Sequence, residues 1–172
     1  MAIVEYRPPY TEETAAIRPG IFLAGPIQGA PDWQDQAVSI LTREYSGLPT
    51  LSIFNPRVRG WSDHGYTEQV RWEKSHLERV RELGAIMFWF AAKDDRLLYE
   101  PGRAYAQTSR IELGRAFGWK DYNRGVAIAL GIEPGYIGNG KYFRSLASEY
   151  RIPVYTNLAS LCIATLDLLP RQ

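Results

Sequence analysis

Short apolar runs alternate along the chain with longer segments in which apolar residues recur every three or four positions. Four of these runs are apolar or nearly so: 21–24 (Ile-Phe-Leu-Ala), 51–54 (Leu-Ser-Ile-Phe), 85–90 (Ala-Ile-Met-Phe-Trp-Phe) and 126–130 (Val-Ala-Ile-Ala-Leu). A continuous apolar run of this length is typical of a strand that is buried on both faces of a parallel sheet. A shorter fifth strand is expected at residues 152–155.

Helices are expected between these strands. The apolar periodicity places them at residues 32–45, 67–83, 109–118, 142–150 and 158–169. Strands that alternate with helices indicate a parallel sheet with helices on both faces. The sequence therefore predicts an α/β, flavodoxin-like (Rossmann-like) three-layer sandwich, with a five-stranded parallel sheet in the order 2-1-3-4-5.

Residues 1–20 differ from the rest of the chain. They contain Pro8, Pro9 and Pro19 and show no clear period, so we expect an extended N-terminal arm or a frayed tail. An extended arm could reach across to another subunit. The remaining residues, 21–172, are long enough for a single domain with a sizeable core.

Charge and cysteine content narrow the function classes. Twenty basic and nineteen acidic residues give a formal net charge of +1, so we expect no binding of nucleic acid or of a membrane surface by charge alone. No apolar run is long enough to span a membrane, and the N-terminus lacks the apolar segment of a secretory signal. The single cysteine, Cys162, fits a reducing compartment. We therefore expect a cytoplasmic protein.

The segment 108–118 carries the first candidate chemistry. Ser109 and Glu112 form a Ser-x-x-Glu pattern at the expected start of a helix, where it is typical of a capping box. A carboxylate near a helix N-terminus is also expected to stay ionised at neutral pH, as a nucleophile in glycosyl transfer must. The local sequence is compatible with both roles for Glu112.

The second candidate is an acidic residue on the apolar stripe of the helix at 67–83. Glu73 lies three residues after Val70 and four before Leu77, so its carboxylate is expected to face inward. Burial of a carboxylate is costly unless it is paired or used. An ion pair with a nearby arginine is the structural alternative. The position of Glu73 at the sheet edge where ligands bind favours a functional role.

Several of these features converge on one cleft. The topological switch point of the predicted sheet falls between the first and third strands. The Gly25-Pro26 loop, where backbone can approach a ligand closely, opens there. So does the loop 91–107, whose length is typical of a lid or a binding loop. Because Glu73 lies at the same edge, the cleft favours a functional role for Glu112 over a purely structural one.

Signatures of metals and cofactors are weak. The segment 135–141 (Gly-x-x-x-x-Gly-Lys) resembles a phosphate-binding loop, but Tyr142 stands where Ser or Thr would bind magnesium. His64 and His76 are twelve residues apart without a second pair of ligands, so no zinc site is expected. We predict neither a metal nor an organic cofactor.

Three segments together resemble the nucleoside 2-deoxyribosyltransferase-like family. They are Ile21-Phe22-Leu23-Ala24-Gly25-Pro26, Trp72-Glu73 and Thr108-Ser109-Arg110-Ile111-Glu112-Leu113-Gly114. The similarity extends from about residue 21 to the final helix. The resemblance implies a flavodoxin-like fold and cleavage of an N-glycosidic bond. It also implies a homodimer or a higher homo-oligomer in which a neighbour completes each site.

The resemblance also assigns roles to individual residues. It implies that Glu112 is the nucleophile, that Glu73 contacts the base, and that Gly25 and Pro26 lie near the nucleotide. Further candidates for substrate binding are Asn55, Arg57, Trp72, Thr108, Ser109 and Arg110.

The sequence departs from the family pattern near these residues. Residues 106–109 (Ala-Gln-Thr-Ser) stand where the family commonly has an aspartate, and Glu73 replaces the usual aspartate. Arg103 and Arg110 are unusual close to a neutral sugar. They raise the alternative of a phosphorylated substrate, because arginine suits bidentate contacts with phosphate.

We therefore predict an enzyme that cleaves or transfers the N-glycosidic bond of a nucleoside or nucleotide. A covalent glycosyl-enzyme forms on Glu112, and water or a second base then displaces it, as in an N-glycoside hydrolase or a deoxyribosyltransferase. Glu73 orients the base and helps proton transfer to it. The alternative is a non-catalytic sensor module that binds a nucleotide in the same cleft without turnover.

Overall fold

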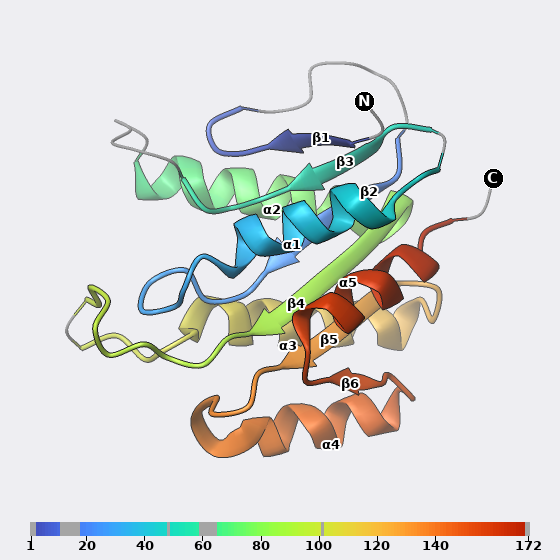
Figure 1. Ribbon diagram of the computed structural model, residues 1–172. Coiled ribbons are helices and arrows are strands. Elements are labelled where there is room, and N and C mark those ends of the chain that lie inside the picture. Colours follow the sequence, from blue (N-terminus) through green and yellow to red (C-terminus); the bar gives the residue numbers. More distant parts are fainter. Residues whose placement is uncertain (1–2, 11–17, 48, 59–64, 101, 171–172) are drawn as a thin grey trace.

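Six parallel strands form a sheet that has helices on both faces (Figure 1). The structure, a computed structural model, describes residues 3–10, 18–47, 49–58, 65–100 and 102–170. The strands are β1 (Ile3–Tyr6), β2 (Gly20–Ala24), β3 (Leu51–Phe54), β4 (Gly84–Phe90), β5 (Ala127–Ile132) and β6 (Val154–Tyr155). The helices are α1 (Trp33–Glu44), α2 (Tyr66–Leu83), α3 (Gln107–Tyr122), α4 (Lys141–Glu149) and α5 (Leu158–Asp167), with a short 3-10 helix at Ile137–Gly140.

The strand order confirms the predicted topology and adds one strand. The sheet has the order β1-β3-β2-β4-β5-β6, which without β1 is the predicted 2-1-3-4-5 order. The predicted count of five strands is wrong, because Ile3–Tyr6 pairs in parallel with β3. This edge strand is only half-buried and contains Glu5, so no continuous apolar run marks it. Residues 11–17 of the expected N-terminal arm lie outside the described residues.

The two central strands are β2 and β4, and every residue in both is buried. In Figure 1, α1 and α5 lie on one face of the sheet, while α2 and α3 lie on the other. α2 packs on β2 and β4, and α5 packs on β4 and β5. A strand that is covered on both faces has no polar face to alternate with an apolar one. This explains why continuous apolar runs were sufficient to locate the central strands.

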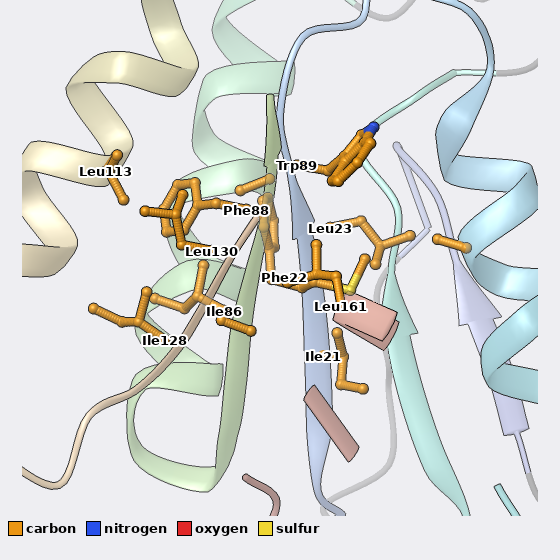
Figure 2. Close-up of a cluster of buried hydrophobic side chains, with 14 of the residues drawn as sticks. Ile21, Phe22, Leu23, Ile86, Phe88, Trp89, Leu113, Ile128, Leu130 and Leu161 are labelled. Carbon is orange, nitrogen blue, oxygen red and sulfur yellow. The ribbon is translucent and has the colours of Figure 1, made fainter. Parts of the chain in front are cut away.

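Side chains of β4 alternate between two halves of the core (Figure 2). Ile86 and Phe88 lie on the side of Leu113 in α3, whereas Trp89 lies on the opposite side with Leu161 of α5. All five side chains are buried. The sheet is thus clamped between two apolar layers, and the loops at the carboxyl ends of its strands extend from a rigid base.

The last helix contains the single cysteine. Cys162 is buried in α5, and burial raises the pKa of its thiol to about 12. A thiol with so high a pKa is a poor nucleophile. Within the described parts of the chain, no helix combines the length and the apolar character needed to cross a membrane.

Candidate active site

A cavity of about 330 Å³ lies at the carboxyl edge of the sheet. Its wall comes from the loop after β2, the segment after β3, the first turns of α2, the loop after β4 and the start of α3. The structure brings six of the predicted site residues into this wall: Gly25, Pro26, Glu73, Thr108, Ser109 and Glu112. The cavity therefore forms at the switch point that the strand order predicts.

Further polar and aromatic side chains line the cavity although the sequence did not single them out for binding. They are Gln28, Tyr66, Gln69, Tyr99 and Gln107. Arg103, which the sequence raised only as a sign of a phosphorylated substrate, also lines it. Tyr99 and Arg103 belong to the loop after β4, whose length was the one available signal.

The loop after β2 approaches β4 so closely that only glycine fits at its start. A Cβ atom at Gly25 would lie 2.2 Å from the carbonyl oxygen of Trp89 and 2.6 Å from the indole ring of Trp33. The Trp33 indole N–H donates a hydrogen bond of 2.9 Å to the carbonyl oxygen of Pro26. These contacts fix the backbone that forms one wall of the cavity.

Two residues expected to bind substrate instead hold the loops behind the cavity. The side-chain amide of Asn55 donates to Glu5 of β1 at 2.8 Å, and its oxygen accepts the backbone N–H of Arg57 at 3.0 Å. Asn55 is fully buried and does not line the cavity. It therefore joins the end of β3 to the edge strand.

Arg57 fastens the loop after β2 from the side away from the cavity. Its Nη2 group donates to the carbonyl oxygens of Ile27, Ala30 and Pro31 at 3.3, 3.4 and 3.0 Å. Its Nε donates to Gln34 at 3.0 Å. Burial lowers the pKa of the guanidinium. Arg57 is occupied by these carbonyls and is not among the residues that line the cavity, so it positions the loop.

Trp72 and Arg110 also point away from the cavity. The Trp72 indole N–H donates to the carbonyl oxygen of Tyr10 at 2.7 Å, and its ring packs against Phe22. Arg110 donates from Nε to the Tyr136 hydroxyl at 3.1 Å. Neither residue lines the cavity, so the expectation that they contact the substrate has no support in this geometry.

The predicted capping box is wrong, because α3 begins earlier than its sequence indicates. Its N-cap is Ala106, and no side chain caps the helix. Ser109 is buried in the first turn and Glu112 lies in the second, so neither can act as the cap. Ala106 has φ 55°, a left-handed conformation that costs a non-glycine residue about 1–2 kcal/mol. It lines the cavity, which is where such strain tends to be tolerated.

Glu73 faces the cavity, not the apolar core. The stripe that placed it inward was misassigned, because Val70 is 42% exposed and the buried side of α2 consists of Trp72, His76, Leu77 and Val80. Glu73 is half-buried, and its Oε1 accepts a hydrogen bond of 2.7 Å from the side-chain amide of Gln69. It shares the cavity wall with Glu112.

The electrostatics of Glu112 also differ from the expectation. Its pKa is raised from 4.5 to about 8, first by burial and then by the negative charge of Glu73, while Arg115 acts in the opposite direction. The expected ionisation at neutral pH is therefore wrong for this structure. The helix dipole acts mainly within the first turn, and Glu112 lies one turn beyond it, where desolvation dominates.

Two carboxyl groups that share one half-buried cavity resist ionising together. At neutral pH the pair of Glu73 and Glu112 thus holds a proton close to a second, charged carboxylate. Acid-assisted cleavage of a glycosidic bond requires one group that donates a proton and a second group that acts as a nucleophile or a base.

The histidines do not form a metal site in the part of the chain that the structure describes. His76 is buried between Phe54 and Trp72, and its Nδ1 lies 2.8 Å from the Trp72 carbonyl oxygen. His64 lies outside the described residues. Among those that are described, no three His, Cys, Asp or Glu side chains are grouped to hold a metal ion.

The fold and the site together define an α/β protein with a carboxyl pair in a cavity at the switch point. A family model described as nucleoside 2-deoxyribosyltransferase like matches residues 18–117, which is more than half of the chain. The chain belongs to the nucleoside 2-deoxyribosyltransferase-like family. The match contains both Glu73 and Glu112. No curated protein shows a significant match to the sequence.

The raised pKa of Glu112 makes the stability of the fold depend on pH. Between pH 4.5 and about 8 the folded protein retains a proton that the unfolded chain releases, so the free energy of unfolding falls as pH rises through this window. Glu112→Gln removes the ionisable group. We expect this variant to gain about 4 kcal/mol relative to the wild type at pH 9 compared with pH 5, measured by urea unfolding.

The matched control is Glu149→Gln, which changes an exposed carboxylate in α4. Its stability difference from the wild type should be the same at both pH values. A Glu112→Gln variant that behaves like this control would show that the carboxyl group of Glu112 is not desolvated.

Proposed function

We propose that the protein breaks the N-glycosidic bond of a nucleoside or nucleotide through a covalent intermediate on Glu112. A carboxylate oxygen of Glu112 bonds to the anomeric carbon as the bond from that carbon to the base nitrogen breaks. The base leaves with the bonding electrons and takes up one proton. Water or a second base then attacks the same carbon and releases Glu112, which gives hydrolysis or transfer with overall retention.

The observation that carries this proposal is the carboxyl pair in one cavity. Glu73 and Glu112 come from different helices and line the same wall. The pair retains a proton at neutral pH because the pKa of Glu112 is raised. Attack requires an ionised Glu112, so the proton has to reach Glu73 or the base before the bond breaks. Glu73 is the group placed to orient the base and pass the proton to it.

The size and lining of the cavity support a small ligand with a flat ring. A volume of about 330 Å³ lies at the lower end of the range for small-molecule sites. Tyr66 and Tyr99 provide aromatic faces in its wall, against which a base can stack. A sensor module would use the same surfaces without turnover. Saturable binding of a nucleotide with no release of free base would support that alternative.

We also propose that the protein acts as a homodimer or a higher homo-oligomer, in the cytoplasm. Large apolar side chains are exposed near the cavity: Tyr66 is 74% exposed and Ile111 is 67% exposed. Leu98, next to Tyr99 in the loop after β4, is 96% exposed. A second subunit that covers these side chains would also exclude water from the reacting bond. The reduced thiol of Cys162 fits a cytoplasmic location.

Sedimentation velocity at micromolar concentration should show a dimer or a larger assembly. Ile111→Glu places a charge among the exposed apolar side chains and should shift the protein toward monomer. Tyr122→Glu is the matched control, since Tyr122 is 96% exposed at the far end of α3 and outside the cavity wall. A wild-type protein that sediments only as a monomer would contradict the proposed assembly.

Glu112→Gln tests the nucleophile directly. The fold should survive, because glutamine has the same shape, whereas release of base should fall by about a thousandfold or more. Intact-mass spectrometry with a slow 2-fluoro nucleoside should show a sugar-sized increment on the wild type and none on the variant. Glu149→Gln should form the adduct normally. An active Glu112→Gln enzyme would rule out the covalent mechanism.

The pH dependence tests whether the proton shared by the carboxyl pair takes part in the reaction. If this proton passes to the base through Glu73, the reacting form of the pair carries one proton, so kcat/KM should be level below about pH 8 and fall about tenfold per pH unit above it. A kcat/KM that rises up to pH 8 would show instead that the proton must leave the pair before Glu112 attacks. The measurement is the initial rate of base release between pH 5.5 and about 9.5 at a substrate concentration well below KM.

A further inference from the structure

We propose that the substrate carries a 5′-phosphate and that Arg103 and Thr108 bind it, so that the site takes nucleoside 5′-monophosphates in preference to nucleosides. This inference rests on the proposed function, because it names the substrate class of the same cavity.

The cavity has a second lobe that lies between α2 and α3. This outer lobe has a volume of about 310 Å³ and shares Glu73, Arg103, Thr108 and Glu112 with the cavity described above, the inner lobe. Lys74 and Arg115 complete its charged wall. A ligand whose reacting bond lies at Glu112 can therefore extend from the inner lobe into a region lined by cations.

Arg103 is the cation common to the two lobes. Its guanidinium donates from Nη2 to the Thr108 hydroxyl at 2.9 Å, and its Nη1 lies 3.8 Å from Glu100. The side chain is 33% exposed, so it remains accessible from the cavity. A neutral sugar offers no group that needs a guanidinium, whereas phosphate accepts two parallel hydrogen bonds from one.

Arg103 is not one of the charges that shift the pKa of Glu112. Among the described residues, the charges that shift the pKa of Glu112 are those of Glu73 and Arg115. Arg115 also forms an ion pair with Glu78 at 2.7 Å. Arg103 thus adds to the shared wall a positive charge that is not among the causes of the shift in the pKa of Glu112.

The loop around Arg103 is also held by hydrogen bonds that do not involve the guanidinium. The backbone carbonyl of Arg103 accepts a hydrogen bond from the Tyr99 hydroxyl, and its N–H donates to the carbonyl oxygen of Glu100 at 3.4 Å. Tyr105, two residues later, donates from its hydroxyl to the Ala91 carbonyl at 2.9 Å. The guanidinium, whose own contacts are Thr108 and the more distant Glu100, can therefore turn to a ligand without releasing these bonds.

Thr108 places the anion at a suitable distance from the reacting carbon. Its hydroxyl accepts from Arg103 and retains a proton to donate. Thr108 lies one helical turn before Glu112 on the same face of α3, about 5–6 Å away between Cβ atoms. In a nucleoside 5′-phosphate the anomeric carbon C1′ and the carbon C4′, which carries the phosphate through C5′, flank the ring oxygen. One sugar can therefore span the two residues. Binding of this remote group can then assist the reaction at Glu112.

The test compares each of the common ribonucleosides and 2′-deoxynucleosides with its own 5′-monophosphate. Initial rates of base release give kcat/KM for both members of each pair. For the pair that reacts best, we expect the monophosphate to be favoured by about tenfold or more. Addition of inorganic phosphate to the nucleoside should not reproduce this preference, which separates a phosphorylated substrate from a free anion.

Arg103→Gln should lower the ratio of the two kcat/KM values by about tenfold or more, because one charge-assisted contact is lost. Arg96→Gln is the matched control. Arg96 belongs to the same loop, pairs with Asp94 at 2.8 Å and does not line either lobe, so its loss should leave the ratio unchanged. Arg103→Lys should restore the preference only in part, since lysine keeps the charge and lacks the planar fork.

The outcomes separate this inference from the proposed function. Base release from nucleosides at an equal or higher kcat/KM would overturn the phosphate site and leave the proposed function standing. If no substrate releases base, the proposed function fails, and calorimetric titration decides the inference. Tighter binding of the monophosphate than of the nucleoside, lost in Arg103→Gln, would support the phosphate site, whereas equal affinities would overturn it.

Discussion

The repulsion and desolvation of two carboxyl groups, Glu73 and Glu112, is the constraint on which the site depends. Each group alone would ionise readily in water, but one half-buried cavity raises the pKa of Glu112 to about 8. This arrangement persists because both helices that carry the groups are anchored to the same sheet. Leu77 and Val80 bury one face of α2, and Leu113 buries one face of α3. The apolar core thus supplies the free energy that keeps an unfavourable pair of carboxyl groups in place.

A polar network supports the cavity from behind. Arg57 holds the loop after β2 through three backbone carbonyls, and Asn55 ties the neighbouring segment to the edge strand β1. Arg7 of the segment after β1 extends this network through ion pairs with Glu5 and Asp35. The edge strand therefore contributes to the shape of the site although none of its residues lines the cavity. The close approach of the Gly25 backbone to the carbonyl of Trp89 then fixes the cavity wall formed by the loop after β2.

The sequence was sufficient for the order of the central strands, because strands buried on both faces leave continuous apolar runs. It missed β1, whose four residues are half-buried and include Glu5. It also misplaced the start of α3, because the chain enters that helix through a left-handed Ala106 in place of a capping side chain. No local signal in an alanine reports such a conformation, which depends on how the loop after β4 packs.

The candidate site was predictable where it follows from topology and less so where it depends on side-chain direction. Glu73, Glu112 and Gly25 reach the cavity because they follow parallel strands that end at one edge of the sheet. Arg57, Trp72 and Arg110 lie close in sequence to residues of the cavity wall. Their side chains instead form hydrogen bonds with other parts of the protein. The pKa of Glu112 could not be predicted from the sequence, because it depends on burial and on a charge from another helix.

The proposed phosphate and the carboxyl pair constrain each other. A phosphate near Glu112 adds negative charge, which by itself would raise the pKa of that carboxyl group further and oppose the ionisation needed for attack. Arg103 at the shared wall, together with Lys74 and Arg115 in the outer lobe, offsets the charge of the phosphate. This reduces the effect of the phosphate on the pKa of Glu112. The same cations would be of little use to a neutral nucleoside. The proposed phosphate site therefore depends on the cations of the shared wall and the outer lobe to balance a substrate that brings its own anion.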